Sequence, residues 1–241
     1  MSFYKFERYF KESIKLRKHS KQNFWIFELL RDFPLYYRCL NNGISPIINE
    51  KPWITFAAHR FLHRQLRPDM RVYEFGTGGS TLYFAHHTKE IISVEHDKSW
   101  AERVSKALKF SGKNNWQINI IEPHFDQATL HEDPASLNSY ISNDDNYRGQ
   151  SFVNFAKDID RYTDGYFNIV LIDGRARPSC FRHSVKKVCR YGFLILDNAE
   201  RRHYIRIHEQ MNDPHWTRYS FFGPGPYHDC FWQTVIWQRN F

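Results

Sequence analysis

One stretch of the chain joins an apolar run to a glycine-rich turn. Residues 72–81 read Val-Tyr-Glu-Phe-Gly-Thr-Gly-Gly-Ser-Thr, and a second apolar run, residues 91–95, ends in Glu95. A buried strand, a glycine turn, a helix and a second strand ending in an acid form the layout of a nucleoside-binding βαβ unit. A turn that merely joins a strand to a helix would use the same glycines, and that alternative stays open. The stretch predicts an α/β enzyme that uses a nucleoside-containing cofactor.

The residue types in this turn indicate which cofactor it would bind. Gly76 and Gly78 let the backbone approach a ligand closely, and Glu95 is placed to accept hydrogen bonds from ribose hydroxyls. A dinucleotide fingerprint needs a third glycine where Thr81 stands, and no Gly-Lys-Ser/Thr phosphate loop is present. Glu74 would repel a pyrophosphate but attract an ammonium or a sulfonium group. We therefore expect S-adenosylmethionine as the cofactor.

The turn resembles the first motif of the class I S-adenosylmethionine-dependent methyltransferases, an acid-x-Gly-x-Gly-x-Gly pattern. Glu74, Gly76 and Gly78 match it, while Ser80 stands where the third glycine usually does. The resemblance covers roughly residues 70 to 241 and implies that Glu95 binds the ribose of the cofactor. The expected cofactor-binding residues are Glu74, Gly76, Thr77, Gly78, Gly79, Ser80, Thr81, Glu95 and Asp173.

Two further strand ends carry side-chain oxygens, at Asp173 and at Asp197-Asn198. The carboxyl ends of parallel strands meet at one crevice, so these three residues are expected to converge and could hold a divalent cation. Their spacing resembles the metal-ligand set of the catechol and caffeoyl-CoA O-methyltransferases, which implies Mg²⁺ that lowers the pKa of the acceptor. Those enzymes tend to have a lysine where this chain has Ala176. Helix capping by the two aspartates is the alternative.

Candidate catalytic residues are Asp173, His96 and His183, since both histidines would titrate near neutral pH. Arg175 and Arg177 follow Asp173 closely and suit a carboxylate, sulfate or phosphate on the substrate. The expected reaction is methylation of a hydroxyl on a small molecule or saccharide, and the two arginines favour an anionic one. A nucleic-acid methyltransferase and a non-catalytic binding module of the same fold are the alternatives.

The net charge of +8 is concentrated near the start of the chain. Residues 1–21 hold seven Lys or Arg against two Glu, so 7 − 2 gives +5 of it. A basic amphipathic segment can attract nucleic acid, anionic lipid or an acidic substrate, can serve self-association into a homo-oligomer, or is simply a solvated helix face.

The order of the segments predicts one α/β domain with an appendage. Residues 1–50 are expected to form a helical N-terminal cap and linker, with Pro34 interrupting an apolar segment, and residues 51–241 the methyltransferase domain. Strands alternate with helices after residue 70, which predicts a doubly wound, Rossmann-like sheet of seven strands with its last strand reversed. Residues 1–50 and the polar loop 123–150 are expected to lie over the crevice. The expected strands are residues 71–75, 91–95, 117–122, 167–173, 193–197, 216–222 and 230–238.

The four cysteines, Cys39, Cys180, Cys189 and Cys230, form no C-x-x-C pair. No apolar run approaches the roughly 18 residues that a membrane span needs, and the start of the chain does not resemble a signal peptide. We therefore expect a cytoplasmic protein with reduced cysteines and no membrane span.

Overall fold

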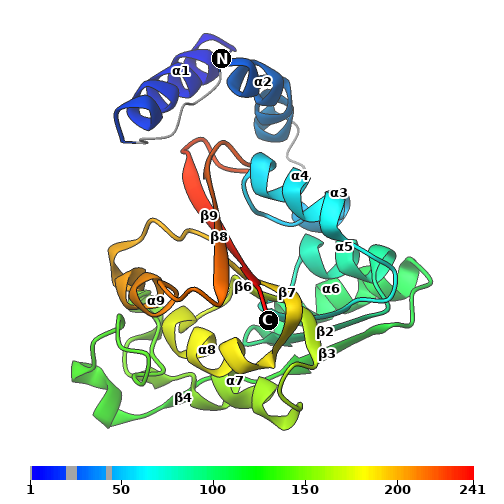
Figure 1. Cartoon of the computed structure of the whole chain (residues 1–241), viewed down its shortest axis with the longest axis vertical. Helices are drawn as coiled ribbons and strands as arrows, with labels where there is room; N and C mark the ends of the chain where they lie inside the picture. Colours follow the sequence, from blue (N-terminus) through cyan, green and yellow to red (C-terminus); the bar gives the residue numbers. More distant parts are fainter. Residues whose placement is uncertain (1, 20–25, 42–44) are drawn as a thin grey trace.

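The computed structural model describes residues 2–19, 26–41 and 45–241. Its centre is a seven-stranded sheet in the order β3-β2-β1-β6-β7-β9-β8, in which only β9 runs against its neighbours (Figure 1). This confirms the predicted α/β sheet with a reversed last strand. The strands are β1 (Arg71–Phe75), β2 (Glu90–Glu95), β3 (Trp116–Ile120), β6 (Phe167–Ile172), β7 (Val188–Leu196), β8 (Trp216–Gly223) and β9 (Trp232–Arg239).

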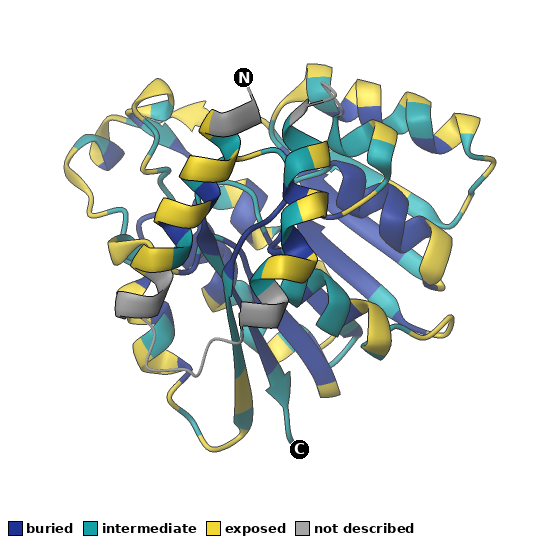
Figure 2. Ribbon diagram, turned by 90° about the horizontal axis from the view of Figure 1, so that it is seen from above, coloured by how far each residue is buried: buried dark blue, intermediate teal, exposed yellow. Residues whose placement is uncertain are grey.

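Helices cover both faces of the sheet. The helices α4 (Phe56–Gln65), α5 (Gly79–His87) and α6 (Lys98–Phe110) pack on one face, and α7 (Val153–Lys157), α8 (Arg177–Ser184) and α9 (Ile205–Gln210) pack on the other. Each face has its own hydrophobic cluster, and the strands between them are buried (Figure 2). Because β1, β2 and β6 are covered on both sides, they carry continuous rather than alternating apolar residues.

The strand order reverses between β1 and β6, where the chain changes from one helical layer to the other. In an open α/β sheet, ligands bind beyond the carboxyl ends of the strands at such a point. Gly76 follows β1 with φ +96°, and a Cβ on it would lie 3.4 Å from backbone atoms of Gly174 after β6. The dihedral therefore favours glycine at residue 76, whereas a Cβ there would make an ordinary van der Waals contact with Gly174.

The N-terminal segment contains α1 (Ser2–His19), α2 (Ile26–Asn41) and the short α3 (Pro46–Asn49). The interruption expected at Pro34 does not occur, because α2 continues through it. Pro34 is exposed, so water can satisfy the carbonyl group that loses its partner. In α1 the large apolar side chains face mostly outward: Phe10 is 59% exposed, whereas Tyr9 is buried. The helix packs through Tyr9, against α2 and Phe231.

The segment 123–150 is more ordered than a polar loop. Its strand β4 (His124–Phe125) pairs antiparallel with β5 (Gln150–Ser151), and two 3₁₀ turns, Gln127–His131 and Asp145–Tyr147, lie between them. Three further 3₁₀ turns, Asp158–Arg161, Val185–Lys187 and Arg202–Tyr204, connect other elements. Within the described residues, no helix combines the length and the apolar character that crossing a bilayer requires.

Candidate functional site

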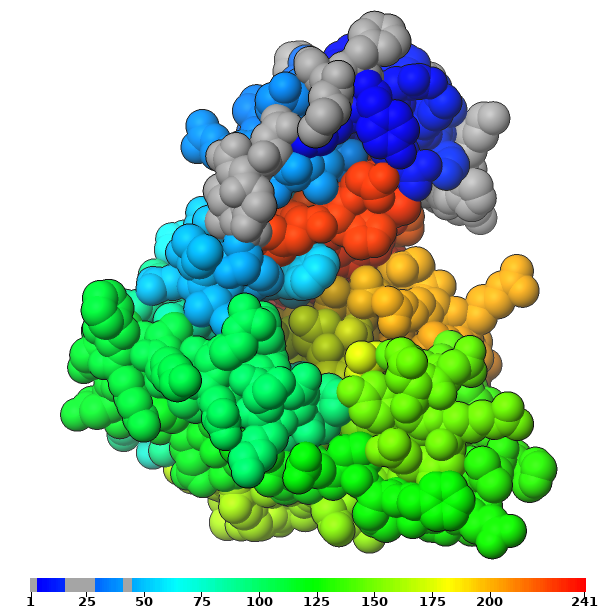
Figure 3. Space-filling view, turned by 180° about the vertical axis from the view of Figure 1, so that it is seen from behind, coloured from blue at the N-terminus to red at the C-terminus, as the bar shows by residue number. Residues whose placement is uncertain are grey.

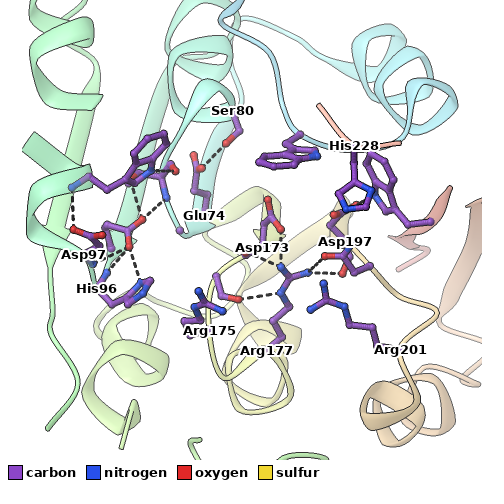
Figure 4. A pocket seen from close by; sticks show the side chains of 18 of the residues that line it. Glu74, Ser80, His96, Asp97, Asp173, Arg175, Arg177, Asp197, Arg201 and His228 are labelled. Atoms are coloured by element: carbon purple, nitrogen blue, oxygen red, sulfur yellow. Dashed lines mark hydrogen bonds and ion pairs between the residues drawn. The ribbon is translucent and has the colours of Figure 1, made fainter. Parts of the chain in front are cut away.

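A cavity of about 680 Å³ opens at the carboxyl ends of β1, β2, β6 and β7 (Figures 3 and 4). The glycine turn, the acid that ends β2 and the two aspartates after β6 and β7 all line this cavity. These strand ends therefore converge as expected. The lining residues are Trp53, Glu74, Gly76, Thr77, Ser80, Glu95, His96, Asp97, Trp100, Tyr147, Asp173, Gly174, Arg175, Arg177, Asp197, Asn198, Glu200, Arg201, His228, Cys230, Phe231 and Trp232.

The helix that follows the glycine turn is held from two sides. Thr81 Oγ1 accepts the Gly78 N–H at 3.0 Å, which satisfies a donor at the start of α5. A Cβ on Gly79 would collide with the carbonyl oxygens of Pro46 and Lys51. Gly79 therefore lets the segment with α3 pack on the turn, which is a packing role rather than direct exposure to the cavity. Among the expected cofactor residues, Gly78, Gly79 and Thr81 do not line the cavity.

Glu95 is buried at the end of β2 and is surrounded by donors. Its Oε2 accepts the backbone N–H of Thr77 at 2.9 Å and the Thr77 hydroxyl at 3.0 Å, while Oε1 accepts the N–H groups of His96 and Asp97 at 2.7 and 3.0 Å. Burial alone would raise its pKa, but His96 and these N–H groups outweigh burial, and the pKa of Glu95 is lowered. Glu95 is thus an ionised acceptor, and the Thr77 hydroxyl is its one donor that can rotate away in favour of a ribose hydroxyl.

Glu74 is a second buried acid, on β1 beneath the turn. Its Oε1 accepts the Ser80 hydroxyl at 2.6 Å and its Oε2 the Ser93 hydroxyl at 3.3 Å. Among the residues that the structure describes, no backbone N–H group donates to it, and burial raises its pKa to about 8 in spite of the hydroxyls. A protonated, buried carboxyl group of this kind would ionise when a cation arrives, which fits the ammonium or sulfonium groups of S-adenosylmethionine.

His96 connects the acid of β2 to the segment 123–150. Its Nδ1 lies 2.7 Å from Glu95 Oε1 without the alignment of a hydrogen bond, and its Nε2 lies 2.9 Å from the Tyr147 hydroxyl. His96 therefore lines the cavity, but both ring nitrogens face protein groups. Its contacts fit a residue that positions Glu95 better than one that removes a proton from an acceptor.

His183 does not reach the cavity, which corrects its assignment as a candidate base. It lies in the last turn of α8, where Nδ1 is 2.8 Å from Asp160 Oδ2 and Nε2 is 3.1 Å from the Tyr140 hydroxyl. The helix α8 begins at Arg177, which lines the cavity, whereas His183 near its other end does not line it. Sequence proximity to Asp173 was therefore misleading, because a helix of eight residues separates its two ends by about 12 Å.

Arg177 is buried in the floor of the cavity, among the residues expected to bind a metal ion (Figure 4). Its five N–H groups make five hydrogen bonds, and all five acceptors are oxygens at the ends of β6 and β7. The acceptors are the Gly174 carbonyl, the Asp173 carbonyl and Oδ1, the Asp197 carbonyl and Asn198 Oδ1. Arg177 has no N–H left for a substrate, so its assignment as a substrate-binding residue is corrected.

The donor set of Asp173, Asp197 and Asn198 does not fit a divalent cation. Asp173 and Asn198 each share a side-chain oxygen with Arg177, and Asp197 Oδ1 accepts from Trp232 Nε1 at 2.9 Å and from the Thr234 hydroxyl at 2.6 Å. The position between these oxygens is taken by a guanidinium group that carries the positive charge a metal would supply. A second cation beside it would be repelled at short range.

The pKa values of the two aspartates are raised above those of ordinary surface acids. Burial, and then the neighbouring charge of Asp173, raise the pKa of Asp197 to about 7. Burial also raises the pKa of Asp173, although Arg177 opposes this and 32% of its side chain is exposed to the cavity. Asp173 is the more accessible of the two and has one carboxylate oxygen that Arg177 does not engage. It is therefore the better placed group to accept a proton.

Arg175 and Arg201 face the cavity from its outer wall (Figure 4). Arg175 forms an ion pair with Asp144 at 2.8 Å, and its guanidinium lies 5.0 Å from the centre of the Tyr147 ring. Arg201 was not identified from the sequence, because it belongs to a run of polar residues after Asp197 with no motif of its own. Only the folded chain brings it beside Arg177.

The aromatic wall opposite comes from Trp53 and from the segment between β8 and β9. No described residue before Trp53 lines the cavity, so the expectation that residues 1–50 lie over the crevice is wrong for the part of them that the structure describes. The first two helices instead cover the β8–β9 connection (Figure 3): the Tyr36 hydroxyl donates to the Asp229 carbonyl at 3.0 Å. They support Cys230 and Phe231, which do line the cavity.

Solved structures of methyltransferases share this architecture. A Klebsiella pneumoniae protein described as a candidate O-methyltransferase superposes with a TM-score of 0.57 at 14% identity, over 98% of this chain and 99% of its own. The O-methyltransferase TomG of Streptomyces achromogenes, solved with S-adenosylmethionine, gives 0.56 at 15% identity and 98% of each chain. The chain has the fold of class I S-adenosylmethionine-dependent methyltransferases. An rRNA methylase of Streptococcus thermophilus has this fold as well, with a TM-score of 0.52, 13% identity and coverage of 77% of this chain and 95% of its own. No protein-family model and no curated protein matches the sequence.

Proposed function

We propose that the protein transfers a methyl group from S-adenosylmethionine to a hydroxyl group of a small molecule or saccharide. The observation that carries the proposal is the meeting of three features in one cavity: the Gly76 turn, the ionised Glu95 and the accessible carboxylate of Asp173. S-adenosylmethionine supplies an electrophilic methyl group on a sulfonium sulfur. The fold is compatible with this chemistry, and the residues of the cavity support it.

Each half of the cavity has a separate task in this proposal. Glu95 accepts the ribose hydroxyls after the Thr77 hydroxyl turns away, and Glu74 faces the positive charge of the cofactor as a carboxylate. Asp173 accepts the proton that the acceptor hydroxyl loses as its oxygen gains the methyl group. Arg177 keeps Asp173 in place through the Oδ1 contact of 2.8 Å. The products are a methyl ether and S-adenosylhomocysteine, and the proton passes to solvent from Asp173.

Nucleic-acid methylation is supported by the net charge of +8, but the cavity itself argues against it. Its lining holds six acids and only three arginines, which does not favour a polyanion. The acids are Glu74, Glu95, Asp97, Asp173, Asp197 and Glu200, and the arginines are Arg175, Arg177 and Arg201. A non-catalytic module would keep the cofactor cavity and fail only in turnover.

Two measurements test the proposal. Calorimetry with S-adenosylmethionine and S-adenosylhomocysteine should show 1:1 binding, and labelled methyl transfer to a panel of hydroxyl-bearing acceptors should identify a substrate. With that substrate, Asp173→Asn should lower kcat by about 10²- to 10⁴-fold with little change in cofactor affinity, as expected for loss of a general base. Absence of cofactor binding would reject the proposal, and binding without turnover on any acceptor would favour the non-catalytic module.

A further inference from the structure

A second cavity of about 300 Å³ adjoins the first one behind its arginine-bearing wall. The two cavities share Gly174, Arg175, Arg177 and Arg201, so this wall is the boundary between them. The charges on the two sides differ in sign. Acids outnumber arginines around the first cavity, whereas the second is lined by these three arginines and one acid, Asp144.

The three arginines are not equally available to a ligand. Arg177 donates all five N–H groups to oxygens of the chain, and Arg175 forms an ion pair with Asp144. The Arg201 guanidinium has no hydrogen-bond or ion-pair partner among the residues that the structure describes. Its backbone is fixed all the same, because the Arg201 N–H donates to the Asn198 carbonyl at 3.2 Å and its own carbonyl accepts from Tyr204 at 2.9 Å. A fixed backbone with a free guanidinium is suited to capture an anion.

We propose that the second cavity binds an oxyanion carried by the methyl acceptor, with Arg201 as its main contact and Arg175 as the second. This assignment rests on the proposed function, since it places a charged group of the acceptor behind the cavity that holds the cofactor. The cationic cofactor then lies among acids and the anionic part of the acceptor among arginines. A carboxylate, sulfate or phosphate group satisfies the same donors.

Asp144 marks where the oxyanion would bind. Its carboxylate Oδ2 lies 2.8 Å from Arg175 Nη1, the geometry that a ligand carboxylate or phosphate would adopt. Neutral donors line the same cavity at Ser142, Asn143 and Tyr204. An oxyanion that replaces Asp144 at Arg175 while contacting Arg201 would break the ion pair between the segment 123–150 and this wall, while Tyr147 keeps its contact with Arg175. Binding of the acceptor is therefore in competition with an ion pair of the chain itself.

The test uses the full chain and inorganic phosphate, sulfate and acetate as probes, titrated at constant ionic strength and followed by NMR chemical shifts. Arg201→Met should weaken phosphate binding about tenfold or more, since a charge-assisted hydrogen bond is lost. Arg202→Met is the matched control: the neighbouring arginine is exposed and lines neither cavity, and its loss should change the affinity less than about twofold. Equal weakening in both variants would show a diffuse charge effect and overturn the proposal.

A second pair of variants tests the competition. Asp144→Asn removes the carboxylate paired with Arg175 and should strengthen phosphate binding severalfold, whereas Asp145→Asn makes the same change of charge on an exposed neighbour that lines neither cavity. If both variants strengthen binding equally, Asp144 is not the competitor and the assignment fails.

A further experiment distinguishes failure of the anion site from failure of the proposed function. All titrations are repeated with saturating S-adenosylhomocysteine. Unchanged phosphate affinity is expected, because the oxyanion lies beyond the shared wall, and competition between the two ligands would place the anion in the first cavity and overturn the proposal. A chain that binds phosphate through Arg201 but does not bind S-adenosylhomocysteine would keep the anion site and reject the methyltransferase assignment. No saturable binding of any of the three probes would overturn the anion site alone.

Discussion

The two ends of the large cavity solve the burial of carboxylates in different ways. At the end that contains the glycine turn, Glu95 is satisfied by N–H groups and a hydroxyl from residues within 18 positions of it. At the end that contains Arg177, Asp173 depends on the Arg177 guanidinium, and Asp197 depends on Trp232 and Thr234 of a distant strand. Local donors make one end a preformed acceptor of hydroxyl groups. The other end is a charge network that folding must assemble, so substitutions there should cost stability first.

The largest expected effect is therefore on stability, from Arg177→Met. Removing this cation leaves the partly buried Asp173 carboxylate and the carbonyl groups of Asp173, Gly174 and Asp197 without this partner, and breaking a buried ion pair costs about 3–5 kcal/mol. Urea unfolding monitored by circular dichroism measures the loss. Arg175→Met is the matched control, since its ion pair with Asp144 is partly exposed and should contribute only about 0–1 kcal/mol. Similar costs for both variants would contradict the contrast between a structural and a surface arginine.

The next largest effect concerns cofactor affinity. Glu95→Ala should weaken binding of S-adenosylhomocysteine by about 1–3 kcal/mol, the cost of losing hydrogen bonds to a charged acceptor, with a smaller loss of stability than Arg177→Met. Calorimetry is the measurement. Glu90→Ala, at the far end of the same strand, should leave the affinity unchanged. Unaltered affinity in the Glu95 variant would remove this residue from the cofactor site.

A smaller effect comes from the raised pKa of Glu74, about 8. Below pH 8 the free protein holds this carboxyl protonated, and a cation that requires the carboxylate must displace the proton. Affinity for S-adenosylhomocysteine should then rise with pH by up to about tenfold per unit and level off above pH 8. Glu74→Gln should flatten the profile. A wild-type profile that is already flat between pH 6 and 8 would show that Glu74 does not sense the cofactor.

The raised pKa of Glu74 also makes the stability of the folded protein depend on pH. The folded pKa of Glu74 lies above its unfolded value, so the folded state binds more protons between about pH 4.5 and 8. Glu74 therefore lowers the free energy of unfolding as the pH rises through this window, by at most about 1.4 kcal/mol per unit. Thermal unfolding of the wild-type protein and of Glu74→Gln at pH 5 and pH 8 measures this loss: the stability of the wild type relative to the variant should be lower at pH 8 than at pH 5.

The smallest expected effect is that of metal removal. Because Arg177 already supplies a positive charge to Asp173 and Asn198, treatment with a chelator should change neither the melting temperature nor the binding of S-adenosylhomocysteine. Added Mg²⁺ should likewise leave both unchanged. An increase of several degrees in melting temperature on adding Mg²⁺ would show that the aspartates bind a cation together with Arg177.

The sequence alone determined the sheet, its reversed last strand and the place of the glycine turn, because these follow from local patterns: apolar runs, glycine positions and an acid at a strand end. It also brought Asp173 and Asp197 to one crevice through a general rule of parallel sheets. Only the tertiary structure decided what these aspartates contact. The Arg177 side chain turns inward and donates all its N–H groups to the chain, Arg201 has no hydrogen-bond partner for its guanidinium among the described residues, and His183 lies at the far end of its helix. Such roles depend on which way each side chain points and, for Arg177 and His183, in part on partners 20 or more residues distant, and no spacing along the chain records either.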